Sequence, residues 1–197
     1  MEKVKETNIT SLQNNFFQTC KKCNGYCCQN ARPPITRKRK EIISKYLAVQ
    51  GLRIENPFDK TTYTFIRETS DGFCVLFDKV TRKCLVHSVK PETCEAGPIT
   101  FDINLQTGKV EWFLKSESIC PLAGILHKDK DVLEKYLSSA KKALQTFIQE
   151  LDAEALYTLL KIEEPETFKI EEDSLSPEIL EKITENENIF SHCTSYK

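Results

Sequence analysis

Hydrophobic positions change their period along the chain, and the first clear signal is helical. Between Thr36 and Gly51 the apolar residues recur on one face, at Ile42, Ile43, Tyr46 and Leu47. Thr36 is a suitable N-cap, and Gly51 suits the position just after a helix end. The pattern therefore predicts a helix between these two residues.

From about residue 61 to 115 the pattern is that of short strands. TTYTFI is β-branched and aromatic, and FCVLF is a short apolar run that ends at the charged turn DKVTRK. ITFDINL and KVEWFL flank the turn QTG, and each run alternates apolar with polar residues. They predict a β-hairpin whose inward residues are Ile99, Phe101, Ile103, Leu105, Val110, Trp112 and Leu114.

A helical period returns at about residue 129. One long apolar stripe comprises Val132, Leu133, Tyr136, Leu137, Ala140, Leu144, Phe147, Ile148 and Leu151. A second helix is expected after the cap Asp152, and a short last helix after Ser176-Pro177. Residues 163–197 carry ten Asp or Glu against three Lys, so we expect this acidic end to be loosely held.

These patterns predict an α+β protein. A small cysteine-rich, metal-binding domain with short antiparallel strands and loops would occupy residues 1–127. A helical C-terminal extension with an acidic tail would occupy residues 128–197.

Composition and charge limit the classes of function. The chain of 197 residues is 40% hydrophobic and 29% charged, which allows a globular core. The net charge of −1 gives no overall electrostatic reason to bind nucleic acid or an anionic membrane. No apolar run approaches the roughly 20 residues that span a bilayer, and the N-terminus lacks the apolar region of a secretory signal. We therefore expect a cytoplasmic protein with no nucleic-acid or membrane partner.

Nine cysteines change the picture, because cytosolic thiols stay reduced unless a metal or a catalytic cycle uses them. Clustered cysteines are thus interpreted as metal ligands before disulfides. Cys193 stands alone in the acidic tail and is interpreted as an incidental thiol. The eight candidate ligands are Cys20, Cys23, Cys27, Cys28, Cys74, Cys84, Cys94 and Cys120.

Zinc and an iron–sulfur cluster are the two metal hypotheses. Cys20-x2-Cys23 has a spacing that lets two thiolates face one metal, and Gly25 allows backbone amides to turn toward sulfur. Adjacent side chains of an extended segment point to opposite sides, so Cys27 and Cys28 would not both bind one zinc ion easily. Two closed zinc sites would usually need two CxxC pairs, and the chain has one. We therefore favour an iron–sulfur cluster. The alternative for Cys27 and Cys28 is that one of the two is a small buried residue and not a ligand.

The ordered set CKKCNGYCC, FCVLFDKVTRKC, KPETC and ICP resembles the CxxCxxCC (YkgJ-type) cysteine-cluster family, over about residues 20–124. Proteins of that family are described as zinc- or iron-chelating and are often labelled as containing Fe–S clusters. The resemblance implies that the same eight cysteines are metal ligands. The chain departs from the family pattern at two places. Three residues, rather than two, separate Cys23 from Cys27. Lys90 replaces the usual arginine before Pro91, and a lysine cannot form the paired hydrogen bonds of a guanidinium group.

Three functions follow as hypotheses. The first is a [4Fe–4S] protein with an unidentified protein partner and a role in electron transfer, metal handling or support of an enzyme. The second is a structural zinc-binding interaction module. The third is a protein-modifying enzyme, because the family includes relatives of flagellin lysine methylases.

His87 is a further candidate ligand or hydrogen-bond partner, although a surface histidine is the commoner role. Common nucleotide and zinc-protease motifs are absent from the sequence, and the basic run at 37–40 is interpreted as a solvated helix face.

Overall fold

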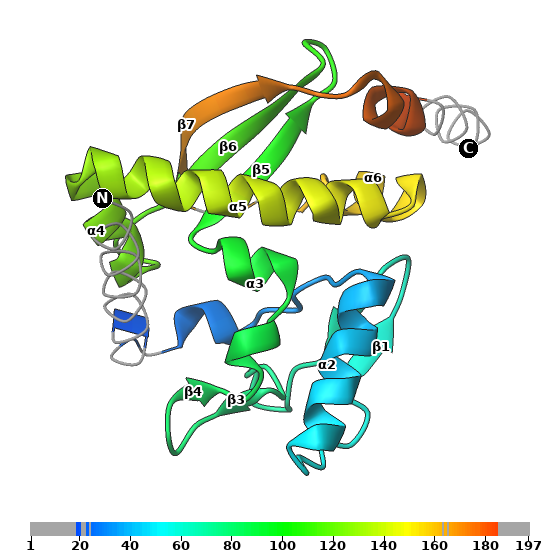
Figure 1. Cartoon of the computed structure of the whole chain (residues 1–197), viewed down its shortest axis with the longest axis vertical. Coiled ribbons are helices and arrows are strands. Elements are labelled where there is room, and N and C mark those ends of the chain that lie inside the picture. Colours follow the sequence, from blue (N-terminus) through cyan, green and yellow to red (C-terminus); the bar gives the residue numbers. More distant parts are fainter. Residues whose placement is uncertain (1–18, 21–22, 24, 163, 165, 185–197) are drawn as a thin grey trace, which may run out of the picture.

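The computed structural model describes residues 19–20, 23, 25–162, 164 and 166–184. The protein is an α+β fold (Figure 1). Its 3₁₀ and α-helices are η1 (Tyr26–Cys28), α2 (Arg37–Val49), η2 (His87–Val89), α3 (Glu92–Ala96), α4 (Pro121–Lys128), α5 (Lys130–Glu150) and α6 (Ala153–Leu159). Its strands are β1 (Phe58–Lys60), β2 (Thr64–Ile66), β3 (Phe77–Asp78), β4 (Lys83–Cys84), β5 (Ile99–Asn104), β6 (Lys109–Lys115) and β7 (Thr167–Ser174).

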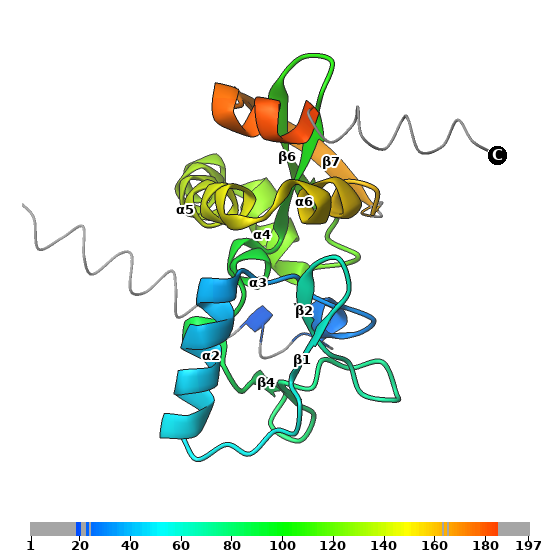
Figure 2. The same ribbon diagram turned by 90° about the vertical axis from the view of Figure 1, so that its right-hand side faces the viewer.

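The elements form two parts, and α3 lies between them (Figures 1 and 2). The lower part in both views contains α2 and two antiparallel hairpins, β1–β2 and β3–β4. The upper part is an antiparallel sheet of order β5-β6-β7 with α4, α5 and α6. Each part has its own cluster of buried residues, drawn from residues 35–86 in the lower part and from residues 96–183 in the upper part. The domain boundary expected at residue 127 stays a prediction.

Helix α2 confirms the first sequence prediction. The hydroxyl of Thr36 accepts the backbone N–H of Arg39 at 3.1 Å, which satisfies a donor that the helix itself leaves unpaired. Gly51 has a φ of +65°, the left-handed conformation that glycine adopts readily after a helix end. Ile43 and Leu47 are buried in the lower core, so the predicted apolar face is the one that packs.

The hairpin of β5 and β6 is also confirmed, in the predicted register. Phe101 pairs with Trp112 and Ile103 with Val110, which brings the apolar positions of both strands to one face. Helix α5 covers that face, and the ring of Phe147 packs edge-on against Phe101. The expected caps are present too, because Asp152 accepts the N–H of Ala155. The last predicted helix is described over residues 177–184.

For residues 166–184 the structure corrects the expectation of a loosely held acidic end, whereas residues 185–197 of that expectation lie outside the described residues. Residues 167–174 form β7, which pairs antiparallel with β6. Charged contacts compensate the acidic side chains of this strand: Lys141 binds Glu171 and Asp173 at 2.6 and 2.8 Å, and the indole N–H of Trp112 donates to Asp173 at 2.7 Å. The strand is therefore held by partners from elsewhere in the chain.

The local structure around the later cysteines differs from the predicted pattern. Helix α3 forms at KPETC and α4 begins at Pro121, although the sequence analysis predicts no helix at either segment. The apolar run FCVLF contributes only Phe77 to a strand, while Cys74 lies in an isolated bridge opposite Glu68. Within the described residues, no helix is both long and apolar enough to span a membrane.

Candidate metal centre

The first four cysteines lie in and around a tight loop. Gly25 has a φ of +74°, and a side chain there would meet the ring of Phe77 at 2.8 Å. The backbone N–H of Cys28 donates to the carbonyl of Gly25 at 2.8 Å, which closes the 3₁₀ turn η1. The glycine is therefore required both by its backbone conformation and by close packing.

Cys27 and Cys28 lie on this turn, and their sulfurs are 4.0 Å apart. The extended geometry that would send the two side chains to opposite sides is thus absent, and both thiols can face one site. The hydrogen bond with Cys28 lowers the pKa of Cys27 to about 6, and the same bond raises the pKa of Cys28. Cys27 is therefore the thiol of the pair that ionises first.

Cys74 and Cys84 lie behind the loop on the β3–β4 side. Cys74 is buried in the lower core, and its backbone N–H donates to the carbonyl of Cys28 at 2.7 Å. Cys84 is half-buried in β4, where it pairs with Phe77. The backbone bond to Cys28 therefore holds Cys74 beside the vicinal pair, and the β3–β4 pairing holds Cys84 in place.

Cys94 and Cys120 approach from the other elements. Cys94 is half-buried in the middle of α3, between the two parts of the molecule. Cys120 precedes Pro121, the first residue of α4, and packs against the upper core. Four of the eight cysteines thus belong to or pack against a hydrophobic core: Cys28, Cys74 and Cys84 in the lower part and Cys120 in the upper part.

Burial and mutual repulsion disfavour the ionised forms of several of these thiols. Burial raises the pKa of Cys20 and Cys74 to about 11, and it raises that of Cys84, Cys94 and Cys120 as well. A negative charge on Cys27 raises the pKa of each of these five thiols further. A charge on Cys23 acts in the same direction on Cys20 and Cys120. Several thiolates together therefore need a compensating cation.

Lys90 supplies part of that positive charge. It follows η2 and is half-buried, and it acts to lower the pKa of Cys20, Cys27 and Cys84. The positive charge of the amine that replaces the family's arginine thus still favours the thiolate forms. His87 is half-buried, and burial followed by the charge of Lys90 lowers its pKa, so it is not a plain surface histidine.

The donor set fits a thiophilic metal. Thiolates are the ligands of structural zinc and of iron–sulfur clusters, and they are poor ligands for magnesium or calcium. In the part of the chain that the structure describes, no group of three His, Cys, Asp or Glu side chains is arranged to coordinate one metal ion. The eight cysteines therefore remain a predicted ligand set, and Cys193 lies outside the described residues.

Sequence reasoning missed the residues that hold α3 in place. At its start, the buried carboxylate of Glu92 accepts the hydroxyl hydrogen of Thr36 at 2.9 Å and pairs with Arg39 at 3.2 Å. At its end, the hydroxyl of Tyr136 donates to the carbonyl of Gly97 at 2.6 Å. No motif signals these contacts, although Glu92 lies two residues before a cysteine.

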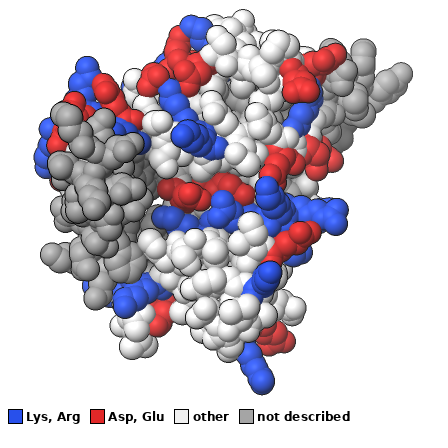
Figure 3. Space-filling view, viewed as in Figure 1, with Lys and Arg blue, Asp and Glu red and all other residues white. Residues whose placement is uncertain are grey.

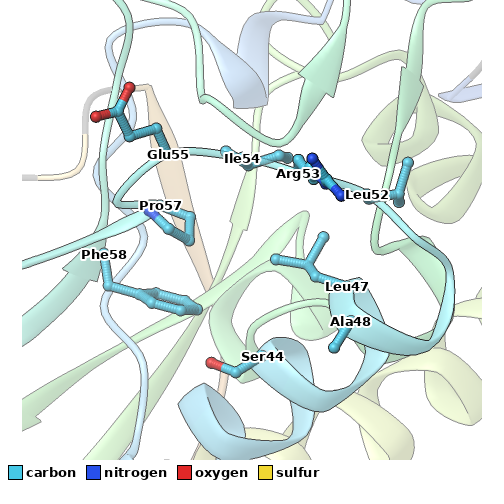
Figure 4. Close-up of a pocket in the computed structure, with 9 residues that line it drawn as sticks. All are labelled: Ser44, Leu47, Ala48, Leu52, Arg53, Ile54, Glu55, Pro57 and Phe58. Carbon is cyan, nitrogen blue, oxygen red and sulfur yellow. The ribbon is translucent and has the colours of Figure 1, made fainter.

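An open hollow lies away from the cysteines, beside the C-terminal half of α2 (Figure 4). It has a volume of about 590 Å³, and the ring of Phe58 and the side chain of Leu47 point toward it from opposite sides. It contains no cysteine, so it is distinct from the candidate metal centre.

Together these features define a small α+β protein of the cysteine-cluster, metal-chelating class. Residues 19–121, just over half of the chain, match the model of the CxxCxxCC family, described as a "Putative zinc- or iron-chelating domain". The chain belongs to this family.

One relative is an uncharacterized protein of Methanocaldococcus jannaschii, which is 27% identical over 157 residues. The match covers 73% of this chain and 77% of that protein. No solved structure matches the chain.

Proposed function

We propose that the protein is a cytoplasmic electron-transfer protein that holds a [4Fe–4S] cluster through cysteines of this set. Support for the proposal comes from Cys27 and Cys28, whose sulfurs are 4.0 Å apart on one 3₁₀ turn, and from Cys74, whose backbone N–H donates to the carbonyl of Cys28 at 2.7 Å. Dispersed single cysteines suit a cluster enclosed by several loops, and four of the eight would suffice as ligands. When bound, such a cluster supplies one-electron exchange with a protein partner.

A structural zinc site is the second candidate, favoured by a different observation. Cys74 belongs to the lower core, whereas Cys120 packs against the upper core. A closed zinc site between them would join the two parts of the fold without any redox chemistry.

One preparation separates the two candidates. The protein is purified without oxygen, and its iron, sulfide and zinc contents and visible spectrum are measured. The iron–sulfur proposal expects iron and sulfide together with broad visible absorption that bleaches on reduction. A colourless protein with stoichiometric zinc and no sulfide would overturn it in favour of the structural site.

Serine substitutions test the ligand set on the same readout. Cys20→Ser, Cys23→Ser and Cys94→Ser should each empty the site, whereas Cys193→Ser should keep full metal content. Comparing Cys27→Ser with Cys28→Ser identifies which member of the vicinal pair ligates. Normal metal content in the first three variants would show that the ligand set is wrong.

A further inference from the structure

The net charge of −1 conceals a strong division along the chain. Residues 1–90 contain 17 Lys and Arg against 8 Asp and Glu, whereas residues 91–197 contain 11 against 21. Among the described residues the division persists, because residues 25–90 contain 13 Lys and Arg against 6 Asp and Glu, and residues 91–162, 164 and 166–184 contain 10 against 18. The lower part is therefore cationic and the upper part anionic. Figure 3 shows a row of basic side chains across the middle of one face, directly below a group of acidic ones. Such separated charge orients partners and raises their rate of association.

The hollow beside α2 lies within the cationic part. Its apolar lining consists of Leu47, Ala48, Leu52, Ile54, Pro57 and Phe58, and we call it the α2 groove. Val49, next to the groove on α2, is 73% exposed. Open apolar hollows of this size, with exposed apolar neighbours, are typical of surfaces that bind a segment of another protein.

Positive charge borders the α2 groove. Arg53 lines it and is exposed, and no ion pair of Arg53 occurs among the described residues. The amine of Lys40 lies 5.4 Å from the centre of the Phe58 ring. Glu55 is the one acidic residue of the lining, and its carboxylate points away from the hollow (Figure 4). Asp59, nearby in β1, bonds the backbone N–H of Lys60.

We propose that the α2 groove binds an acidic segment of a protein partner, with apolar side chains in the groove and carboxylates toward Arg53 and Lys40. The apolar lining is mainly aliphatic, with Phe58 as its one aromatic residue, so it suits aliphatic side chains better than a row of stacked bases. The cationic border selects carboxylates over amines by charge complementarity. This proposal does not depend on which metal the cysteines hold.

Two pairs of variants test the site. Ala48 lines the groove and is exposed, so Ala48→Trp fills the groove, while Val80→Trp places the same side chain on the exposed turn between β3 and β4, away from the groove. Arg53→Glu reverses the charge at the border, and Lys83→Glu makes the same reversal on an exposed residue of β4. Circular dichroism and metal content confirm that each variant folds as the parent protein does.

The probe comes from a phage-displayed library of random dodecapeptides, selected on the full-length, metal-loaded protein. The enriched peptides, made with a fluorescent label, should combine acidic and apolar residues. Their affinity, measured by fluorescence anisotropy, should fall by about tenfold or more in Ala48→Trp and Arg53→Glu, and stay within about twofold in the two control variants.

Several results would overturn the proposal. These are the absence of enrichment, enrichment of basic peptides, or binding that Ala48→Trp leaves unchanged. Tighter binding of a labelled single-stranded RNA, lost in the same variants, would assign the groove to nucleic acid. Self-association in sedimentation that only the groove variants abolish would assign it to a second copy of the chain. If the metal proves to be zinc while peptide binding persists, only the redox proposal fails.

Discussion

Removing the metal should unfold the lower part of the protein and leave the upper part folded. The two cores differ in size, because the lower cluster contains seven described buried residues and the upper one nineteen. A core as small as the lower one supplies about 3–5 kcal/mol at most. A structural metal, by comparison, contributes apparent binding energies of roughly 10–16 kcal/mol to small metal-dependent domains. The free energy lost with the metal is therefore larger than the free energy that the lower core supplies alone.

Hydrogen exchange read by mass spectrometry gives the local result. The protein is compared before and after treatment with a chelator under reducing conditions. Amides of α2 and β2 should lose their protection, while those of β5, β6 and α5 should keep it. The Cys193→Ser variant, treated in the same way, should repeat the pattern of the parent protein. Retained protection in α2 after verified metal loss, or simultaneous loss in both parts, would refute the reasoning.

The remaining predictions concern single side chains of the metal-loaded protein, each measured by urea denaturation. Glu92→Ala should cost about 2–3 kcal/mol, because it leaves Arg39 without its buried partner, and a cost below about 0.5 kcal/mol would contradict that role. Tyr136→Phe should cost about 1 kcal/mol through loss of the bond to the Gly97 carbonyl, and an unchanged midpoint would show that this bond contributes nothing. Gly25→Ala should cost about 1–2 kcal/mol, since it combines a left-handed φ with a clash against an aromatic ring, and it should also lower metal content. A Gly25→Ala protein with full stability and full metal content would contradict this account of the loop.

The sequence was sufficient where local chemistry decides the structure. Thr36 and Gly51 mark the ends of α2 because capping depends on neighbouring residues alone. The hairpin of β5 and β6 follows from alternation around a short turn, and the stripe on α5 follows from one repeated period. In each case the spacing of apolar residues along the sequence predicts which side of the element is buried.

The sequence was insufficient where distant partners decide the structure. β7 contains Glu171, Glu172 and Asp173, and its stability depends on lysines of β6 and α5 that the local sequence does not reveal. The adjacency of Cys27 and Cys28 was interpreted in an extended geometry, but Gly25 closes a 3₁₀ turn there. The candidate ligands could be named from the sequence, whereas the contacts that hold their segments could not.

The pairing of β7 with β6 has a consequence for the order of events during synthesis. The strand that completes the upper sheet begins at Thr167, so that sheet cannot close until most of the 197 residues have left the ribosome. Before then, the upper core against which Cys120 packs is incomplete. With the proposed ligand set, metal loading of the complete site is thus expected to be a late step.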